Sequence, residues 1–225
     1  LPWRYGTPSE RVCQQLAYEL RVIAQAGLAN YFLIVWDIVR HARTHGIRCQ
    51  GRGSAANSLV AYLLAISPID PLAHDLVFER FLSDERPSLP DIDLDIAADR
   101  REEVIQYVYT RYGRDHAAMA CTQITFRARS ALRDVAHALE LPPALLAQAQ
   151  QALDAAAPVG GTPALAAALC RQIDGLPRHL SQHSGGMVIT RAPLYERLPI
   201  EPAAMPGRVV VQWDKDALEI AGLVK

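Results

Sequence analysis

The sequence contains almost no lysine and no long apolar run. Only two of its 23 basic residues, Lys215 and Lys225, are lysines, and the others are arginines. This arginine excess fits genomic base composition as well as phosphate recognition, and a net charge of −1 gives no support to nucleic-acid binding. Because no stretch of about 18 or more apolar residues occurs, we expect no transmembrane helix and no membrane partner.

The chain also lacks the marks of a secreted protein. Its first residues resemble neither a signal peptide nor a natural start, so we expect it to be a piece of a longer protein. Its four cysteines are widely spaced and match no zinc-binding pattern. We therefore expect free thiols in a reducing cytoplasm at Cys13, Cys49, Cys121 and Cys170.

The sequence does not indicate a serine hydrolase or a histidine metal site. Ser181 and Ser184 are not part of a G-x-S-x-G elbow, the turn that presents such a nucleophile. His179 and His183 are four residues apart, a spacing that suits a metal ion only on a helix, and the glycines after them argue against one. Residues 179–186 therefore predict neither a nucleophile nor a metal site.

The most unusual stretch is Pro-Asp-Ile-Asp-Leu-Asp-Ile over residues 90–96. As a strand, it places Asp91, Asp93 and Asp95 on one face and apolar side chains on the other. Aspartate is a poor strand former and like charges repel, so a bound divalent cation such as Mg²⁺ or Mn²⁺ would offset the cost. The alternative is a solvated acidic face on an edge strand, and the stretch alone does not decide between the two.

A glycine-rich turn precedes this acidic stretch. Residues 46–50 predict a short strand, residues 51–58 read Gly-Arg-Gly-Ser-Ala-Ala-Asn-Ser, and residues 59–66 predict a helix. Such a turn presents backbone N–H groups to an anion, and the helix dipole adds to the attraction. We expect Ser54 to cap the helix and to offer its hydroxyl to a phosphate; the alternative is a plain tight turn with an ordinary serine cap.

Several arginines are candidates for phosphate contacts. Arg80 and Arg86 precede the acidic stretch, where guanidinium groups would fork onto phosphate oxygens and balance charge. Arg127, Arg129 and Arg133 begin a predicted helix, in which Arg129 and Arg133 share one face. They would grip a nucleic-acid backbone or form a solvated face, and a surface ion pair is the commoner outcome for any single arginine.

Two helices are expected near the amino terminus. The first covers residues 9–27 and is capped by Ser9. Its predicted buried stripe is Val12, Leu16, Leu20 and Ile23. The second covers residues 31–45, is capped by Asn30, and is apolar enough that we expect it to be well buried.

The rest of the chain predicts further helices and strands. Asp99 and Glu102 have the spacing of a capping box at the start of a helix that ends near Gly113. Strands are expected over residues 117–126, 187–190 and 208–213. Residues 142–172 are rich in Ala, Leu and Gln and predict two helices, the second capped by Thr162. We expect a mixed α/β domain into which a small helical subdomain is inserted.

A Gly-Ser turn that opens a helix, followed by a D-x-D strand, resembles the nucleotidyltransferase superfamily that includes DNA polymerase beta. Longer motifs resemble the palm of the bacterial C-family polymerases, the DNA polymerase III alpha subunits. They are GRGSAANSLVAYLL (51–64), FERFLSDERPSLPDIDLDI (78–96), RREEVIQYVYTRYGRD (100–115), HSGGMVI (183–189) and QWDKDALEIAGLVK (212–225). Four segments resemble the error-prone, damage-tolerant DnaE-type branch: GIRCQGRGSAANS (46–58), ITFRARSALRDV (124–135), PRHLSQHSGG (177–186) and PIEPAAMP (199–206).

This resemblance implies a fold, an activity and a set of partners. The fold would be a polymerase-beta-like nucleotidyltransferase palm in residues 1–122 and 183–225, with an inserted all-α thumb in residues 123–182. The activity would be template-directed transfer of nucleotides from a dNTP to a primer 3′-hydroxyl by a two-metal mechanism, with error-prone translesion synthesis in DNA repair. The partners would be primer–template DNA, the dNTP and, for the whole protein, accessory translesion proteins and the sliding clamp in a bacterial cytoplasm.

The resemblance also implies roles for individual residues. The first two catalytic, metal-binding aspartates of the family fall on Asp91 and Asp93, and its triphosphate-binding pair falls on Gly53 and Ser54. Basic positions expected near the incoming nucleotide fall on Arg80, Arg86 and Lys225. Arg127, Arg129 and Arg133 of the helical subdomain remain the candidates for DNA contacts on the basis of their sequence pattern.

The match departs from the family at the third catalytic aspartate. Asp95 lies on the expected face, but the family does not use this position as the third metal ligand. The third aspartate belongs to a segment resembling LVK-x-D-x-LGL and is expected just beyond Lys225, so we expect the chain alone to bind metal weakly and to lack useful polymerase activity. Two alternatives stay open: a different nucleotidyltransferase that needs no primer, and a non-catalytic DNA-binding module whose acidic strand is structural.

Overall fold

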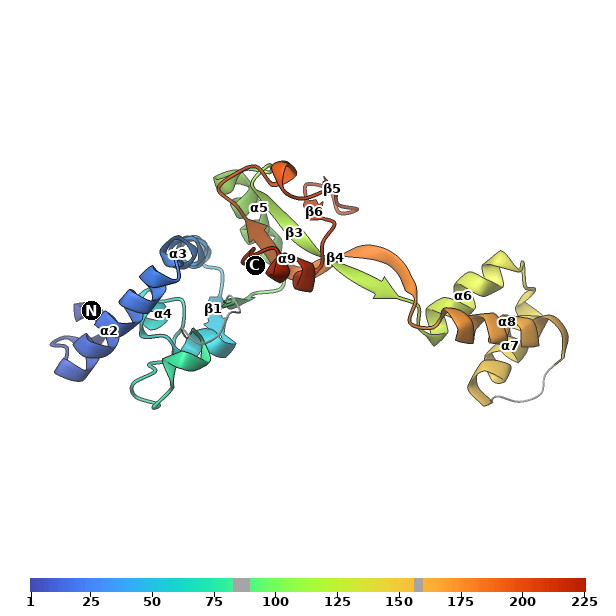
Figure 1. Cartoon of the computed structure of the whole chain (residues 1–225), viewed down its shortest axis with the longest axis horizontal. Helices are drawn as coiled ribbons and strands as arrows, with labels where there is room; N and C mark the ends of the chain where they lie inside the picture. Colours follow the sequence, from blue (N-terminus) through green and yellow to red (C-terminus); the bar gives the residue numbers. More distant parts are fainter. Residues whose placement is uncertain (83–89, 156–159) are drawn as a thin grey trace. The chain divides into compact units, whose positions relative to one another are not determined.

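The protein is described by a computed structural model that covers residues 1–82, 90–155 and 160–225. These residues form two compact units (Figure 1): Leu1–Ala120 together with Ser184–Lys225, and Cys121–His183. Helices and strands alternate in the first unit and helices dominate the second, so the chain is mixed α/β, as predicted.

Helix α2 (Glu10–Gln25) contributes to the core of the first unit and follows the short helix α1 (Pro2–Tyr5). Its predicted cap is confirmed, because the Ser9 hydroxyl oxygen accepts a hydrogen bond from the amide three residues along. The predicted apolar stripe is wrong at one position: Leu20 is 50% exposed, whereas the neighbouring Glu19 is completely buried. A buried carboxylate needs hydrogen-bond donors, and Glu19 receives them from Gln15 on its own helix and from the start of helix α4 (Leu59–Leu63).

Helix α3 (Ala29–Thr44) supplies further residues of the same core. The predicted cap at Asn30 is wrong, because the helix has already begun there and no side chain caps its first turn. Phe32 and Val35 are buried but Leu33 is exposed, so only one face of the apolar run reaches the core. No single helix of the described residues is long and apolar enough to span a membrane; α2 and α3 meet those criteria only as a pair bent by 110°.

A two-stranded sheet carries the glycine-rich turn and the acidic stretch. Its elements and their neighbours are β1 (Cys49–Arg52), the 3₁₀ helix η1 (Gly53–Asn57), α4 (Leu59–Leu63), the 3₁₀ helix η2 (Phe78–Arg80) and β2 (Asp93–Ile96). β1 and β2 are antiparallel, with Arg52 opposite Asp93. The strand predicted over 46–50 therefore begins later and runs into the glycine turn, and the helix predicted over 59–66 is shorter.

Helix α5 (Arg101–Tyr112) follows β2. The predicted capping box of Asp99 and Glu102 is wrong, because Arg100 occupies the N-cap position and no side chain caps the helix. The Arg100 guanidinium instead pairs with Glu103 at 2.7 Å. Glu102 pairs with Arg208 and so does not reach back to the start of the helix.

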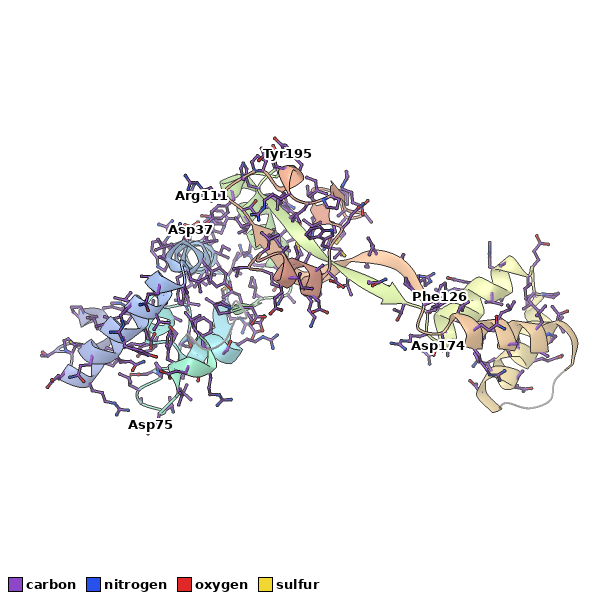
Figure 2. All side chains as sticks on the ribbon, viewed as in Figure 1. Asp37, Asp75, Arg111, Phe126, Asp174 and Tyr195 are labelled. Carbon is purple, nitrogen blue, oxygen red and sulfur yellow. The ribbon has the colours of Figure 1, made fainter. Side chains whose placement is uncertain are left out.

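Asp37 of α3 joins α3 to α5. Its carboxylate accepts hydrogen bonds from the hydroxyls of Tyr107 at 2.7 Å and Tyr112 at 3.0 Å. Arg111, also on α5, lies 3.8 Å from the same carboxylate, and Figure 2 shows Asp37 and Arg111 on these neighbouring helices. The half of the first unit that contains the acidic strand is thus held by polar contacts as well as by apolar packing.

A second sheet has the strand order β4-β3-β6-β5. Its strands are β3 (Ala117–Thr125), β4 (Pro177–Ile189), β5 (Ile200–Pro202) and β6 (Val209–Val211), with the 3₁₀ helix η3 (Leu194–Glu196) and α9 (Lys215–Ile220) nearby in sequence. β3 is parallel to β6, and β5 is antiparallel to β6. Small and branched apolar residues fill its core, among them Ala118, Val188, Val211 and Leu218. The strands predicted over 117–126, 187–190 and 208–213 all fall within this sheet.

The second unit contains helices α6 (Ala128–Ala138), α7 (Pro143–Ala155) and α8 (Gly161–Ile173). They share a core that includes Leu132, Val135, Ala149 and Ala166. The predicted cap at Thr162 is wrong, because Gly160 holds the N-cap position of α8. The inserted segment is helical, and its assignment as a thumb stays a prediction.

Candidate active site

The acidic stretch is a strand edge with its carboxylates turned outward. Asp93 and Asp95 lie in β2 and Asp91 lies just before it. All three aspartates are exposed, whereas Ile92, Leu94 and the following Ile96 are half-buried and pack against the first unit's core. The face assignment made from the alternation is therefore correct.

The glycine–serine turn lies beside the second of these carboxylates. Because Arg52 is opposite Asp93 in the ladder, η1 begins where β2 begins. Gly53 has a φ of +64°, and a Cβ atom added there would lie 4.0 Å from Asp93 Oδ2. The structure therefore brings Gly53 and Asp93 close together, although they are far apart in the sequence.

We expect Gly53→Ala to lower the free energy of unfolding of the first unit by about 1 kcal/mol or more, because alanine is strained at a left-handed φ. The added Cβ makes no clash, so backbone strain is the cause of the expected loss of stability. All three tryptophans (Trp3, Trp36 and Trp213) lie in the first unit, so their fluorescence in a urea titration reports this change. Gly53→Asn should lose less, because asparagine tolerates this conformation better; equal stability of Gly53→Ala and the parent would contradict the reading.

The anion site expected at the start of α4 is already filled by Glu19. Its carboxylate accepts the N–H groups of Leu59 at 2.9 Å and Val60 at 3.0 Å, and the Ser58 hydroxyl at 2.9 Å. Ser58, and not Ser54, caps α4 through its own hydroxyl oxygen. Burial raises the pKa of the Glu19 carboxyl, and these donors oppose that rise.

Ser54 does not cap a helix in the structure. Its hydroxyl has no hydrogen-bond partner among the described residues, and its carbonyl accepts the Asn57 side-chain amide at 3.0 Å. Phosphate binding at Gly53 and Ser54 stays a prediction, and the first turn of α4 is taken by Glu19. The sequence could not reveal this, because Glu19 is 40 residues from Leu59 in the chain.

Lys225 reaches the first carboxylate of the strand. Its ammonium lies 2.8 Å from Asp91 Oδ2, and the Lys225 side chain is 26% exposed. Around this pair is a hollow of about 270 Å³ lined partly by Lys215, Asp216 and Glu219. The contact brings Lys225 to the acidic strand, although the residues are 134 positions apart.

Tyr31 of α3 contacts the backbone next to each member of that pair, at Ile92 and at Lys225, and no local pattern in the sequence indicates this. Its hydroxyl oxygen accepts a hydrogen bond from the Ile92 amide at 2.7 Å, and its proton points to the Lys225 carbonyl at 3.4 Å. Burial raises the pKa of Tyr31, and the charges of Asp91 and Asp93 add to the rise. A tyrosine in an apolar helix reads as an ordinary core residue, which is why it was missed.

Asp95 is occupied by an ion pair. Its carboxylate lies 3.2 Å from the Arg52 guanidinium, and both side chains are more than half exposed. Asp95 therefore differs from Asp93, which faces Gly53, and from Asp91, which faces Lys225. The three aspartates share a face but have three different neighbours.

The other predicted basic residues that the structure describes are exposed. Arg80 is exposed at the end of η2, and Arg86 lies outside the described residues. Arg127, Arg129 and Arg133 are exposed in the second unit. Arg133 lies 3.9 Å from Asp134, which is bound more closely by Arg178 at 2.6 Å. A solvated face with a weak ion pair is what the structure shows at Arg133.

The donor set at the acidic strand fits a hard divalent cation. Asp91 and Asp93 are exposed carboxylates on one face, and the missing side chain at Gly53 leaves space next to Asp93. Over the described ranges, no group of three or more His, Cys, Asp or Glu residues converges to form a metal site. Metal binding by Asp91 and Asp93 therefore stays a prediction.

Comparison with known proteins bears out the resemblance. The family described as bacterial DNA polymerase III alpha NTPase domain matches residues 2–225. Proteins named error-prone DNA polymerase are 54% identical over 245 residues in Anaeromyxobacter sp. (strain K), 50% over 228 residues in Mycobacterium bovis and 48% over 248 residues in Aromatoleum aromaticum. These matches cover 99–100% of this chain and 21–23% of each relative, so the chain spans about a fifth of their length. The chain therefore belongs to the bacterial DNA polymerase III alpha family, in the branch whose relatives are named error-prone DNA polymerases.

Proposed function

We propose that this chain supplies the nucleotidyl-transfer site of an error-prone, DNA-directed DNA polymerase. The observation that carries the proposal is the approach of the Gly53 turn to the Asp93 carboxylate, next to Asp91. A strand with outward carboxylates beside a Gly-Ser turn is an arrangement suited to a metal-bound triphosphate. Family membership supports the same reading.

Asp91 and Asp93 would hold the divalent cations, Mg²⁺ or Mn²⁺, through their carboxylate oxygens. When bound, such ions lower the pKa of an attacking hydroxyl and balance charge on the phosphates. The chain's own contribution is to keep the two carboxylates on one exposed face and to leave space at Gly53. A third aspartate beyond Lys225 would complete the ligand set, and the chain alone is expected to lack useful polymerase activity.

The triphosphate would be bound by Gly53 and Ser54 of η1, with charge balanced by Arg80, Arg86 and Lys225. The free Ser54 hydroxyl and the exposed Arg80 guanidinium support these assignments among the described residues. Lys225 now pairs with Asp91, so its ammonium is already at the strand that would carry the metal. That position suits a cation that must be near both carboxylate and phosphate.

The wider roles follow the family. Residues 1–122 and 183–225 would form the palm, and residues 123–182 the thumb, whose Arg127, Arg129 and Arg133 would contact the DNA backbone. In the whole protein the substrates would be primer–template DNA and dNTPs, and the partners accessory translesion proteins and the sliding clamp. The activity would be mutagenic bypass of lesions during DNA repair in the bacterial cytoplasm.

A Mn²⁺ titration of the chain, followed by paramagnetic broadening of backbone amide resonances, tests the site. We expect weak binding with broadening centred on residues 91–93, and we expect Asp93→Asn to reduce it. Asp75→Asn, which changes an exposed carboxylate paired with Arg11, should leave it unchanged. If the strand ignores the metal, the acidic face is structural. Dependence of the full-length enzyme on primer–template DNA separates a polymerase from a nucleotidyltransferase that needs no primer.

A further inference from the structure

We infer that Tyr31 is a positioning residue of the catalytic strand: its hydroxyl fixes the backbone between Asp91 and Asp93 and ties it to the segment ending at Lys225. This inference rests on the proposed function, because it assigns Tyr31 to the same site. Tyr31 touches neither reacting atoms nor carboxylates directly; it acts through the backbone that carries them.

The β1–β2 ladder stops one residue short of Ile92. The last register pair is Arg52 with Asp93, so Asp91 and Ile92 have no strand partner in this sheet. The Ile92 amide instead donates to the Tyr31 hydroxyl at 2.7 Å, a short and therefore strong contact. Without that oxygen, a partly buried N–H group between the two aspartates would lose its acceptor.

The same hydroxyl reaches the other side of the site. It donates to the Lys225 carbonyl at 3.4 Å, while the Lys225 ammonium binds Asp91 at 2.8 Å. Tyr31, Ile92, Asp91 and Lys225 thus form a closed ring of contacts from three segments that are distant in sequence. One oxygen atom sets the separation between the strand and the segment that follows α9.

The protonation state of Tyr31 suits this double role. Accepting from one group and donating to another requires a neutral hydroxyl, since a phenolate has no proton to donate. Burial and the neighbouring aspartates raise the pKa of Tyr31, which keeps the proton in place at neutral pH.

The packing of the Tyr31 ring does not require its hydroxyl group. The Tyr31 ring packs against the core and lies edge-on to Phe32 at 6.3 Å, and a phenylalanine would preserve those contacts. Tyr31→Phe hence removes only the oxygen. Tyr5→Phe is a matched control, because the Tyr5 hydroxyl also donates one hydrogen bond, to Asp70 at 2.8 Å, in the same unit.

The test uses the full-length protein that contains this chain, with two readouts. In the absence of metal and DNA, hydrogen exchange of the segment 90–96 should be about tenfold faster in Tyr31→Phe than in the parent or in Tyr5→Phe. In primer extension, Tyr31→Phe should lower kcat by about tenfold with little change in the KM for primer–template, because misplacement of catalytic groups costs rate rather than binding.

The outcomes separate this inference from the proposed function. If Tyr31→Phe matches the parent in both exchange and kcat while Asp93→Asn is inactive, the positioning role is wrong and the polymerase site stands. If Asp93→Asn extends primers normally, the proposed function is wrong, whatever Tyr31→Phe does to exchange. Equal losses in Tyr31→Phe and Tyr5→Phe would show a general effect on folding and overturn the inference.

Discussion

Replacing Asp93 with asparagine in the full-length protein is expected to reduce primer extension by about a thousandfold or more. The substitution keeps the size of the side chain but removes the negative charge that a divalent cation needs. Metal ions contribute several kcal/mol of charge stabilisation in phosphoryl transfer, and about 4 kcal/mol corresponds to a thousandfold in rate. The measurement is single-nucleotide incorporation on a primed template.

The control for this prediction lies two residues along the same face. Asp95→Asn removes an equivalent charge but breaks an exposed ion pair with Arg52, which is worth little. We expect Asp95→Asn to keep most of the activity and both variants to keep the fold, because both side chains are exposed. Similar losses in the two variants would mean that general negative charge, and not a metal site at Asp93, supports the reaction.

Replacing Glu19 with alanine is expected to cost the first unit about 3 kcal/mol of unfolding free energy. The change leaves the buried Ser58 hydroxyl and the N–H groups of Leu59 and Val60 without their acceptor. Leaving one buried donor unsatisfied costs about 1–3 kcal/mol. Urea unfolding followed by tryptophan fluorescence measures the loss. Glu10→Ala, an exposed change on the same helix, should cost about 0.5 kcal/mol or less.

The pH dependence of that stability has a definite sign. Burial raises the pKa of Glu19 above its ordinary value of 4.5, so the folded protein binds this proton more tightly than the unfolded chain does. Its contribution is therefore fully present below the ordinary pKa and is lost as the pH rises through the raised one. Relative to Glu19→Gln, which does not titrate, the parent should lose stability as pH increases through this window; a constant difference would contradict the pKa shift.

Local patterns in the sequence predicted what depends on neighbouring residues. The alternation over 90–96 gave the correct exposed and buried faces, because a strand repeats every two residues. The Ser9 cap was also predictable, since a cap needs only the next few residues. The predicted capping box at Asp99 failed because the N-cap is one residue later, at Arg100, and Glu102 pairs with the distant Arg208.

The parts that escaped prediction depend on contacts between distant segments. Leu20 was predicted to be buried and is exposed, whereas the neighbouring Glu19 is buried because helix α4 supplies hydrogen-bond donors to its carboxylate. Tyr31 and Ile92 are 61 residues apart, so no local pattern relates them. The sequence pattern and the family resemblance both pointed to the Gly53 turn and Asp93, but their approach depends on the pairing of Arg52 with Asp93 and on the left-handed turn after β1.

The account depends on Asp91, Asp93 and the Gly53–Ser54 turn binding one metal–nucleotide complex. The most direct measurement is a crystal structure of the full-length protein with primer–template DNA, a non-hydrolysable dNTP and Mn²⁺, using anomalous scattering to locate the metal. The account predicts metal ~2.1–2.2 Å from carboxylate oxygens of both aspartates, and triphosphate oxygens against the amides and hydroxyl of Gly53 and Ser54. Nucleotide and metal bound away from this strand would contradict it.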